Sequence, residues 1–196
     1  MPRSVIGAVG GITPRPNATL SRPADATQYS VNDHIANSAT GSAVLPLTFT
    51  MGIADCSGLI IGARCVLTAA SGSVVTTAAD FDLVLFRPTT SVPFAAGSYP
   101  ADNAALSISA LAANQLVGRF SFINSAWSTS GFAATTARQV VGPASGLVAD
   151  TFNLHGIGTA TVPAPDYLLG LVQAKGTWNP GNVAQSLYFE LIAQGD

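Results

Sequence analysis

The chain has 196 residues, a formal net charge of −2 and only 9% Asp, Glu, Lys and Arg, whereas ordinary soluble domains have about 25%. Its eight basic residues are scattered singly, which argues against nucleic acid as a main partner. No apolar run reaches the roughly 18 residues of a membrane span. The glycine-broken N-terminus is a poor signal-peptide core, so we expect a protein used without secretion through a membrane. A surface so poor in charge hydrates weakly, which favours a protein that works within an assembly.

The N-terminal stretch, residues 1–19, is predicted to be an extended arm, followed by a single domain over residues 20–196. Three prolines exclude a helix in the arm, and three glycines loosen its backbone. Arg3 and Arg15 are its only charges. Such an arm either moves freely in solvent or lies along a neighbour, and the sequence leaves both possibilities open.

The strand patterns begin after a turn at Arg22-Pro23. Residues 44–51 contain Pro46, which cannot donate to a sheet ladder and therefore predicts an edge strand. Residues 59–69 are apolar on both faces apart from Arg64 and predict a central, buried strand. In this segment residues 59, 61, 63, 65 and 67 share one predicted face. Residues 81–87 alternate with a period of two, as a strand with one buried face does.

The second half of the chain continues this rhythm. Residues 104–115 form the one plausible helix, with Asp102 or Asn103 as its N-cap. The other strand candidates are residues 116–122 with Leu116 facing inward and Val117 outward, then 137–141, 151–154, 167–175 and 186–193. Short strands separated by turn residues, without a βαβ rhythm, predict an all-β fold, namely an antiparallel β-sandwich or jelly roll.

A catalytic or metal-binding set is not evident in the sequence. The two histidines, His34 and His155, lie beside polar or glycine residues, where we expect hydrogen-bonded or solvated side chains. No Gly-x-Ser-x-Gly elbow is present. Asp80 and Asp82 share a strand face and could touch one cation, but the favoured interpretation leaves Asp82 facing solvent. We therefore expect no enzyme activity, no cofactor and no metal.

Cysteines and loop aromatics complete the candidate residues. Cys56 and Cys65 are nine positions apart around a strand start, which favours reduced thiols over a disulfide and a buried Cys65. Aromatic residues in turn-rich segments can anchor a sugar or a protein partner. The alternative is that they cap the core, and this is the favoured interpretation. The loop aromatics are Tyr99, Trp127 and Trp178.

Several segments resemble a group of small bacteriophage structural proteins, the jelly-roll head decoration or cement proteins. The segments are SRPADATQYSVNDHIANS at 21–38, GLIIGARCVLTA and DFDLVLFRPTTSVP within 58–93, ADNAAL at 101–106, LVGRFSF at 116–122, and DYLLGLVQAKGTWNPGNVAQSLYFELI at 166–192. Residues 125–136 and the arm lie outside this resemblance. The resemblance implies a β-sandwich bound to the outer surface of a capsid, often as a trimer. It brings no active-site residues with it.

The sequence therefore predicts a virion structural protein, made in the host cytoplasm, that binds the major capsid protein as a homotrimer. The predicted interface residues are Arg3, Arg15, Arg22 and Trp178. Nucleic acid and membrane are not expected as partners. The alternative is a lectin-like module on a virion or tail fibre that holds glycans through loop aromatics such as Trp178, and a hydrolase is a distant third.

Overall fold

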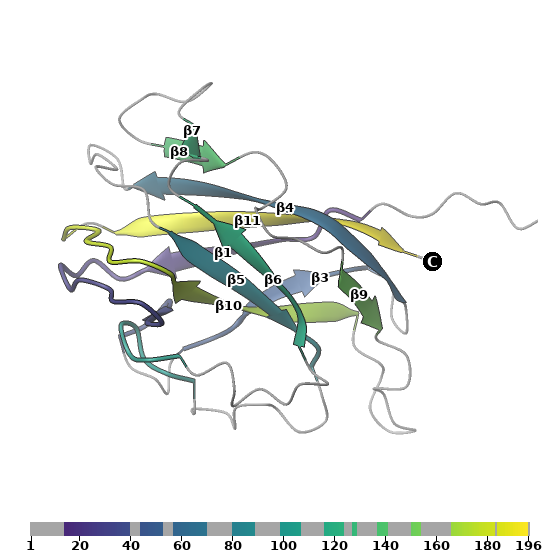
Figure 1. Cartoon of the computed structure of the whole chain (residues 1–196), viewed down its shortest axis with the longest axis horizontal. Coiled ribbons are helices and arrows are strands. Elements are labelled where there is room, and N and C mark those ends of the chain that lie inside the picture. The colour runs from purple at the N-terminus through teal and green to yellow at the C-terminus, as the bar shows by residue number, and fades with distance from the viewer. Residues whose placement is uncertain are drawn as a thin grey trace, which may run out of the picture.

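The structure is a computed structural model of the whole chain. It describes residues 14–39, 44–52, 57–69, 80–88, 99–106, 116–123, 127–128, 137–140, 150–153, 166–182 and 184–195. All regular secondary structure in these ranges is β-strand. The strands form two layers that lie face to face (Figure 1). None of the described residues belongs to a helix with the length and hydrophobicity needed to cross a bilayer.

The described residues contribute eleven strands. These are β1 (Asn17–Arg22), β2 (His34–Ile35), β3 (Leu47–Thr50), β4 (Ser57–Ala69), β5 (Phe81–Phe86), β6 (Leu116–Phe122), β7 (Trp127–Ser128), β8 (Ala137–Val140), β9 (Asp150–Asn153), β10 (Tyr167–Ala174) and β11 (Gln185–Gly195). Each predicted strand segment overlaps one of them.

The strands pair in a nested order that alternates between the two sheets. β1 pairs with β11, β3 with β10, β4 with β8 and β9, and β5 with β6, always antiparallel. The additional pairs β11–β4 and β10–β5 complete a sheet in order β1-β11-β4-β8-β7 and a second in order β2-β10-β5-β6. This winding is a jelly roll, so the predicted antiparallel β-sandwich is confirmed. β4 is central and β3 lies at an edge, as predicted.

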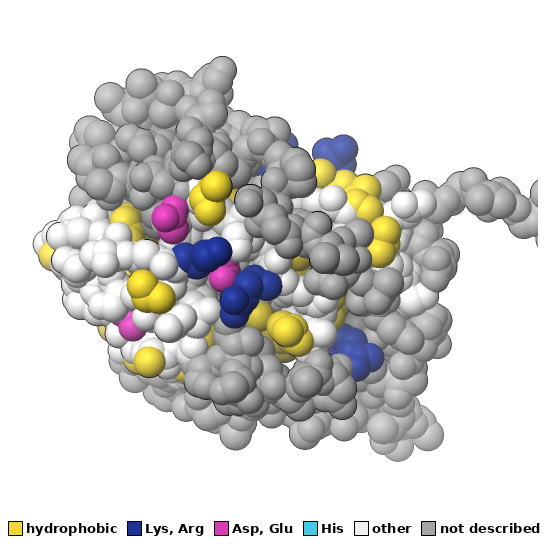
Figure 2. Space-filling model, in the orientation of Figure 1, with side chains coloured by type: hydrophobic (Ala, Val, Ile, Leu, Met, Phe, Trp, Pro, Cys, Tyr) yellow, Lys and Arg dark blue, Asp and Glu magenta, His cyan; other side chains and the backbone are white. Residues whose placement is uncertain are grey.

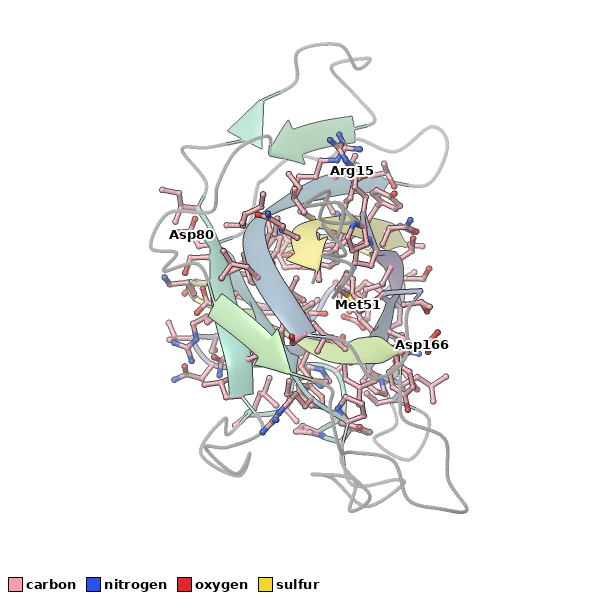
Figure 3. The ribbon with its side chains drawn as sticks, turned by 90° about the vertical axis from the view of Figure 1, so that its right-hand side faces the viewer. Arg15, Met51, Asp80 and Asp166 are labelled. Carbon is pink, nitrogen blue, oxygen red and sulfur yellow. The ribbon has the colours of Figure 1, made fainter. Side chains whose placement is uncertain are left out.

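The main hydrophobic core fills the space between the two sheets. Phe81, Phe122 and Phe189 meet there, with ring centroids 5.1 to 5.9 Å apart. Cys65 of β4 is a free, fully buried thiol in the same core, as the sequence predicted, whereas Cys56 lies outside the described residues. Viewed along the sandwich, side chains crowd the gap between the sheets, with Met51 among them (Figure 3).

Two β-bulges change which residues face the core. In the β4–β11 pair the register skips Ile61, so Ile60 is fully buried and Ile61 is 46% exposed. In the β5–β6 pair it skips Val117, which is buried, while Leu116 is 44% exposed. The predicted inward face of Leu116 is therefore wrong, and Ile61 is an exception to the burial expected of its segment, because one extra residue reverses the alternation on one side of a bulge.

The chain is already part of a sheet before the predicted end of the N-terminal arm. β1 begins at Asn17, and residues before it already lie along β11, where Pro16 O accepts from Leu191 N at 2.9 Å and Pro14 O from Ala193 N at 3.2 Å. The predicted boundary after residue 19 thus falls inside a strand. Residues 1–13 lie outside the described part of the chain.

Part of the outer face of the β2-β10-β5-β6 sheet is covered by the chain itself. Val84, Phe86 and Leu171 pack there with Tyr99 and Leu106 in a second apolar cluster. Of the predicted helix over residues 104–115, residues 104–106 are a turn and a bridge to Asp33 rather than helix. Its remaining residues are outside the described ranges.

Candidate interaction surface

The outer face of the β1-β11-β4 sheet carries a mixed polar and apolar surface. Tyr188 of β11 lies between its strand partners Thr19 and Val66, and Glu190 lies between Asn17 and Arg64. The partly or fully exposed residues of this face are Asn17, Thr19, Ser21, Arg64, Val66, Thr68, Ser186, Tyr188 and Ile192. We call these residues the outer face. Strand residues form it, and Arg64 is its one charged member.

The charges on the outer face form one compact group. The Glu190 carboxylate forms ion pairs with two arginines, accepting from Arg64 Nη2 at 2.8 Å and from Arg15 Nη1 at 3.4 Å. The Glu190 side chain is 9% exposed, whereas those of Arg64 and Arg15 are 36% and 65% exposed. Exposed ion pairs contribute only about 0–1 kcal/mol to stability, so this group fixes side-chain positions more than it stabilises the fold. The predicted interface residue Arg15 lies at the edge of this surface (Figure 3).

A groove opens beside the outer face, where the edges of the two sheets meet at β1 and β3. Its volume is about 320 Å³. Leu45, at its rim, is 71% exposed. Among the described residues no other large apolar residue is as exposed. The groove is lined by Ala18, Thr19, Leu20, Asn37, Leu45, Pro46, Leu47 and Thr48.

Backbone groups of β1 face the open edge at this groove. Pro14 and Pro16 direct their carbonyls to β11, and residues of an antiparallel strand alternate between facing the partner and facing away. Arg15, Asn17 and Thr19 therefore point their N–H and C=O groups away from β11. Within the described part of the chain, no second strand pairs with β1.

A second charged group lies on the opposite sheet and corrects the prediction for Asp82. The Asp82 side chain is 2% exposed, because two basic side chains cover its carboxylate: Arg119 Nε lies 3.4 Å from Oδ2 and Lys175 Nζ lies 3.6 Å from Oδ1. Ser121 donates a hydrogen bond to the same carboxylate at 2.6 Å. Acidic and basic side chains lie next to each other on this face over β5 and β6 (Figure 2). The described residues contain no group of three or more potential metal ligands, and Asp82 is held by cations instead.

Two of the predicted interface residues, Arg22 and Trp178, are packed inside the chain. The Trp178 ring is 2% exposed and stacks on Tyr29 with centroids 5.3 Å apart. The Arg22 guanidinium lies 5.9 Å from the Trp178 ring and 6.0 Å from the Tyr29 ring. Asp25 and the Gly181 carbonyl accept hydrogen bonds from it. Neither side chain is presented to a partner in this conformation, and Arg3 lies outside the described residues.

The burial of Trp178 also bears on the lectin-like alternative. Tyr99 is only 7% exposed, and nothing is described of the Trp127 side chain. The loop aromatics Tyr99 and Trp178 thus cap core clusters, which was the favoured interpretation. Glycan binding through Trp178 would require the stack with Tyr29 to open.

A buried polar network holds the segment around residue 102 against β2. The Asp102 carboxylate accepts from Tyr29 Oη at 2.7 Å and from Ala36 N at 2.7 Å. Burial raises the pKa of Asp102, and burial together with the neighbouring carboxylate raises the pKa of Tyr29. His34 hydrogen-bonds the Pro100 carbonyl at 2.8 Å through Nδ1, which must carry the proton because a carbonyl only accepts.

His34 is structural in this arrangement. Its side chain is 1% exposed, and burial lowers its pKa, so the imidazole is held neutral as a donor to the backbone. The second histidine, His155, lies outside the described residues.

No known protein family matches the sequence, and no curated protein resembles it significantly.

Proposed function

We propose that the chain is a non-enzymatic structural subunit of a phage virion, a decoration or cement protein that binds the outer surface of the head. The observation that supports this proposal is the partly exposed outer face of the β1-β11-β4 sheet, in which Arg64 is the one charged residue. The segment resemblance to decoration proteins supports the same role. Its partners on this proposal are the major capsid protein and further copies of itself, as a trimer.

The physical advantage of such a face lies in the entropy of docking. Immobilising a rotamer-rich side chain costs about 0.5–1.5 kcal/mol at an interface, and the whole chain has one Lys and one Glu. Strand residues such as Thr19, Val66 and Tyr188 are already held by the sheet, so little further order is needed. Many copies on a lattice then convert weak contacts into firm attachment through avidity.

The first experiment asks whether the protein binds capsids at all. Purified chain is mixed with phage heads assembled without it, and the heads are sedimented. We expect saturable co-sedimentation at a fixed number of copies per head, and a higher temperature of head disruption when the sites are full. Absence of binding to the heads would overturn the proposed function.

A matched pair of variants then tests the docking face. Val66→Glu places a charge in the middle of the outer face, whereas Val31→Glu makes the same change in a turn, at a side chain that is 56% exposed. We expect Val66→Glu to weaken binding about tenfold or more, because a desolvated unpaired charge costs more than about 1.4 kcal/mol. Equal binding by the two folded variants would contradict docking through this face.

A further inference from the structure

We propose that the groove between β1 and β3 binds residues 1–13 of a second copy of this chain, which add to the free edge of β1 as an extra strand. The inference concerns self-association, and it holds or fails independently of any capsid. It joins three observations: an open strand edge, a groove beside it that is lined by both apolar and polar residues, and a mostly apolar segment that precedes β1 in the sequence.

The site offers both hydrogen bonds and apolar contact to an extended segment. The N–H and C=O groups of Asn17 and Thr19 face away from β11 and have no strand partner among the described residues. On the other side of the groove, Met51 N donates to Asp166 O, so the alternation along β3 turns the backbone of Thr48 to the open side. Strand addition uses such an edge for affinity and the adjacent side-chain pockets for specificity.

Leu45 at the rim supplies the apolar surface that an added strand would cover. It is 71% exposed, while Leu47 beside it in the groove is 7% exposed. Its backbone is fixed, because Leu45 N donates to Asn37 Oδ1 at 3.0 Å. The backbone that carries the exposed side chain thus has a defined position, and the side chain itself buries little surface within its own chain.

The segment before residue 14 has the composition that this site would accept. It reads MPRSVIGAVGGIT and carries one charged side chain, Arg3. In an extended conformation Ile6, Ala8 and Ile12 share one face, because side chains alternate along a strand. Thirteen extended residues span about 43–47 Å, and a domain of this size has a radius of gyration of about 16 Å. The segment can therefore cross from one copy to the next.

Residues 1–13 are poorly suited to fill the groove of their own chain. To reach it they would have to fold back on β1 through a hairpin turn, and the residues suited to that turn are in the wrong place. Gly10-Gly11 is the pair suited to a tight hairpin turn. That turn sets residue 9 opposite residue 12, so only residues 1–3 would reach the groove at Ala18–Leu20. Bringing Val5 or Ile6 there would require the β-branched Ile12 and Thr13 in turn positions that favour positive φ, which such residues avoid. Exchange between copies has no such restriction, and a head-to-tail exchange closes into a ring when the rotation between neighbouring copies allows it.

A complementation experiment tests the exchange. Three proteins are compared by sedimentation: the full chain, a variant lacking residues 1–13, and full-length Leu45→Asp. We expect the full chain to be a closed oligomer and each variant alone to be monomeric or to dissociate at about tenfold lower affinity or worse. Mixing the two variants must then restore a complex, because one contributes an intact groove and the other an intact segment.

Leu116→Asp is the matched control, since it makes the same change at an exposed leucine on β6, at the far edge of its sheet. It should associate like the full chain. The proposal is overturned if the full chain is monomeric, if the deletion variant still forms the oligomer, if Leu116→Asp dissociates as Leu45→Asp does, or if the mixed variants stay apart. A monomeric full chain that nevertheless binds phage heads would overturn the exchange and leave the capsid role standing.

Discussion

Adding a single methyl group at Gly170 should measurably destabilise the sandwich. Gly170 lies in the middle of β10, between Leu47 of β3 and Leu85 of β5. A Cβ atom there would lie 2.8 Å from Cε2 of Phe49 and 3.2 Å from a methyl carbon of Leu83. Favourable carbon–carbon contacts are about 3.5–4.0 Å, so the Phe49 ring would have to move by roughly an ångström. Phe49 and Leu83 are fully buried, which leaves the ring little space to move into.

We expect Gly170→Ala to cost about 1–3 kcal/mol of unfolding free energy, as overpacking in a filled core does. For a domain of this size that lowers Tm by about 2–4 °C per kcal/mol. Gly62→Ala in β4 is the control, because its Cβ would meet Ile192 at an ordinary 3.5 Å. Urea unfolding followed by tryptophan fluorescence gives both values, and the Gly62→Ala change should stay within about 0.5 kcal/mol of the original chain.

Combining Gly170→Ala with Phe49→Leu separates crowding from other causes. If the clash with the ring is the cause, removing the ring reduces the cost of the added methyl group, and the two changes are not additive. An equal cost for Gly170→Ala and Gly62→Ala, or strict additivity with Phe49→Leu, would refute the reasoning.

The remaining predictions concern buried groups. Trp178→Ala should cost about 3–5 kcal/mol, because the ring is 2% exposed and stacked on Tyr29, and Trp178→Phe should cost clearly less in the same urea titration. The pKa of His34 is lowered by burial. Below about pH 6.5 the His34 imidazole is therefore protonated in the unfolded chain while it stays neutral in the folded chain. Stability should fall as pH drops through that window, and less steeply in His34→Gln; an unchanged slope would contradict the assignment. Burial raises the pKa of Cys65, so in a Cys56→Ser chain a thiol reagent should react only after unfolding, and rapid labelling of the native protein would contradict this.

Local pattern predicted the strands well because their causes are local. The alternation at Gln185–Gly195 matches one buried face, and Leu187, Phe189 and Leu191 are fully buried as expected. The same expectation is wrong for Phe81–Phe86, which is buried on both faces because a second apolar cluster covers Val84 and Phe86. Pro46 predicted an edge strand correctly, because the missing donor excludes a position between two partners. The helix expected from residue 104 is absent over residues 104–106, where pairing with Asp33 competes with helical propensity.

The interaction residues were predicted less well, because burial of a polar or aromatic side chain depends on distant segments. Arg22 and Trp178 are 156 positions apart and bury each other together with Tyr29. Asp82 is covered by cations from β6 and from the end of β10. Asp25 is a local partner of Arg22, but the aromatic rings that bury Arg22 and the two cationic side chains that cover Asp82 do not follow from the residues next to these positions.

By itself, the sequence determined an all-β chain of short antiparallel strands with very little charge, because alternation, turn residues and composition are properties of neighbouring positions. Only the tertiary structure decided the nested pairing, the two bulges that turn Ile61 and Leu116 outward, and the groove beside Leu45. Those features arise from register and from which edges meet, and they are set by contacts between strands that lie far apart along the chain.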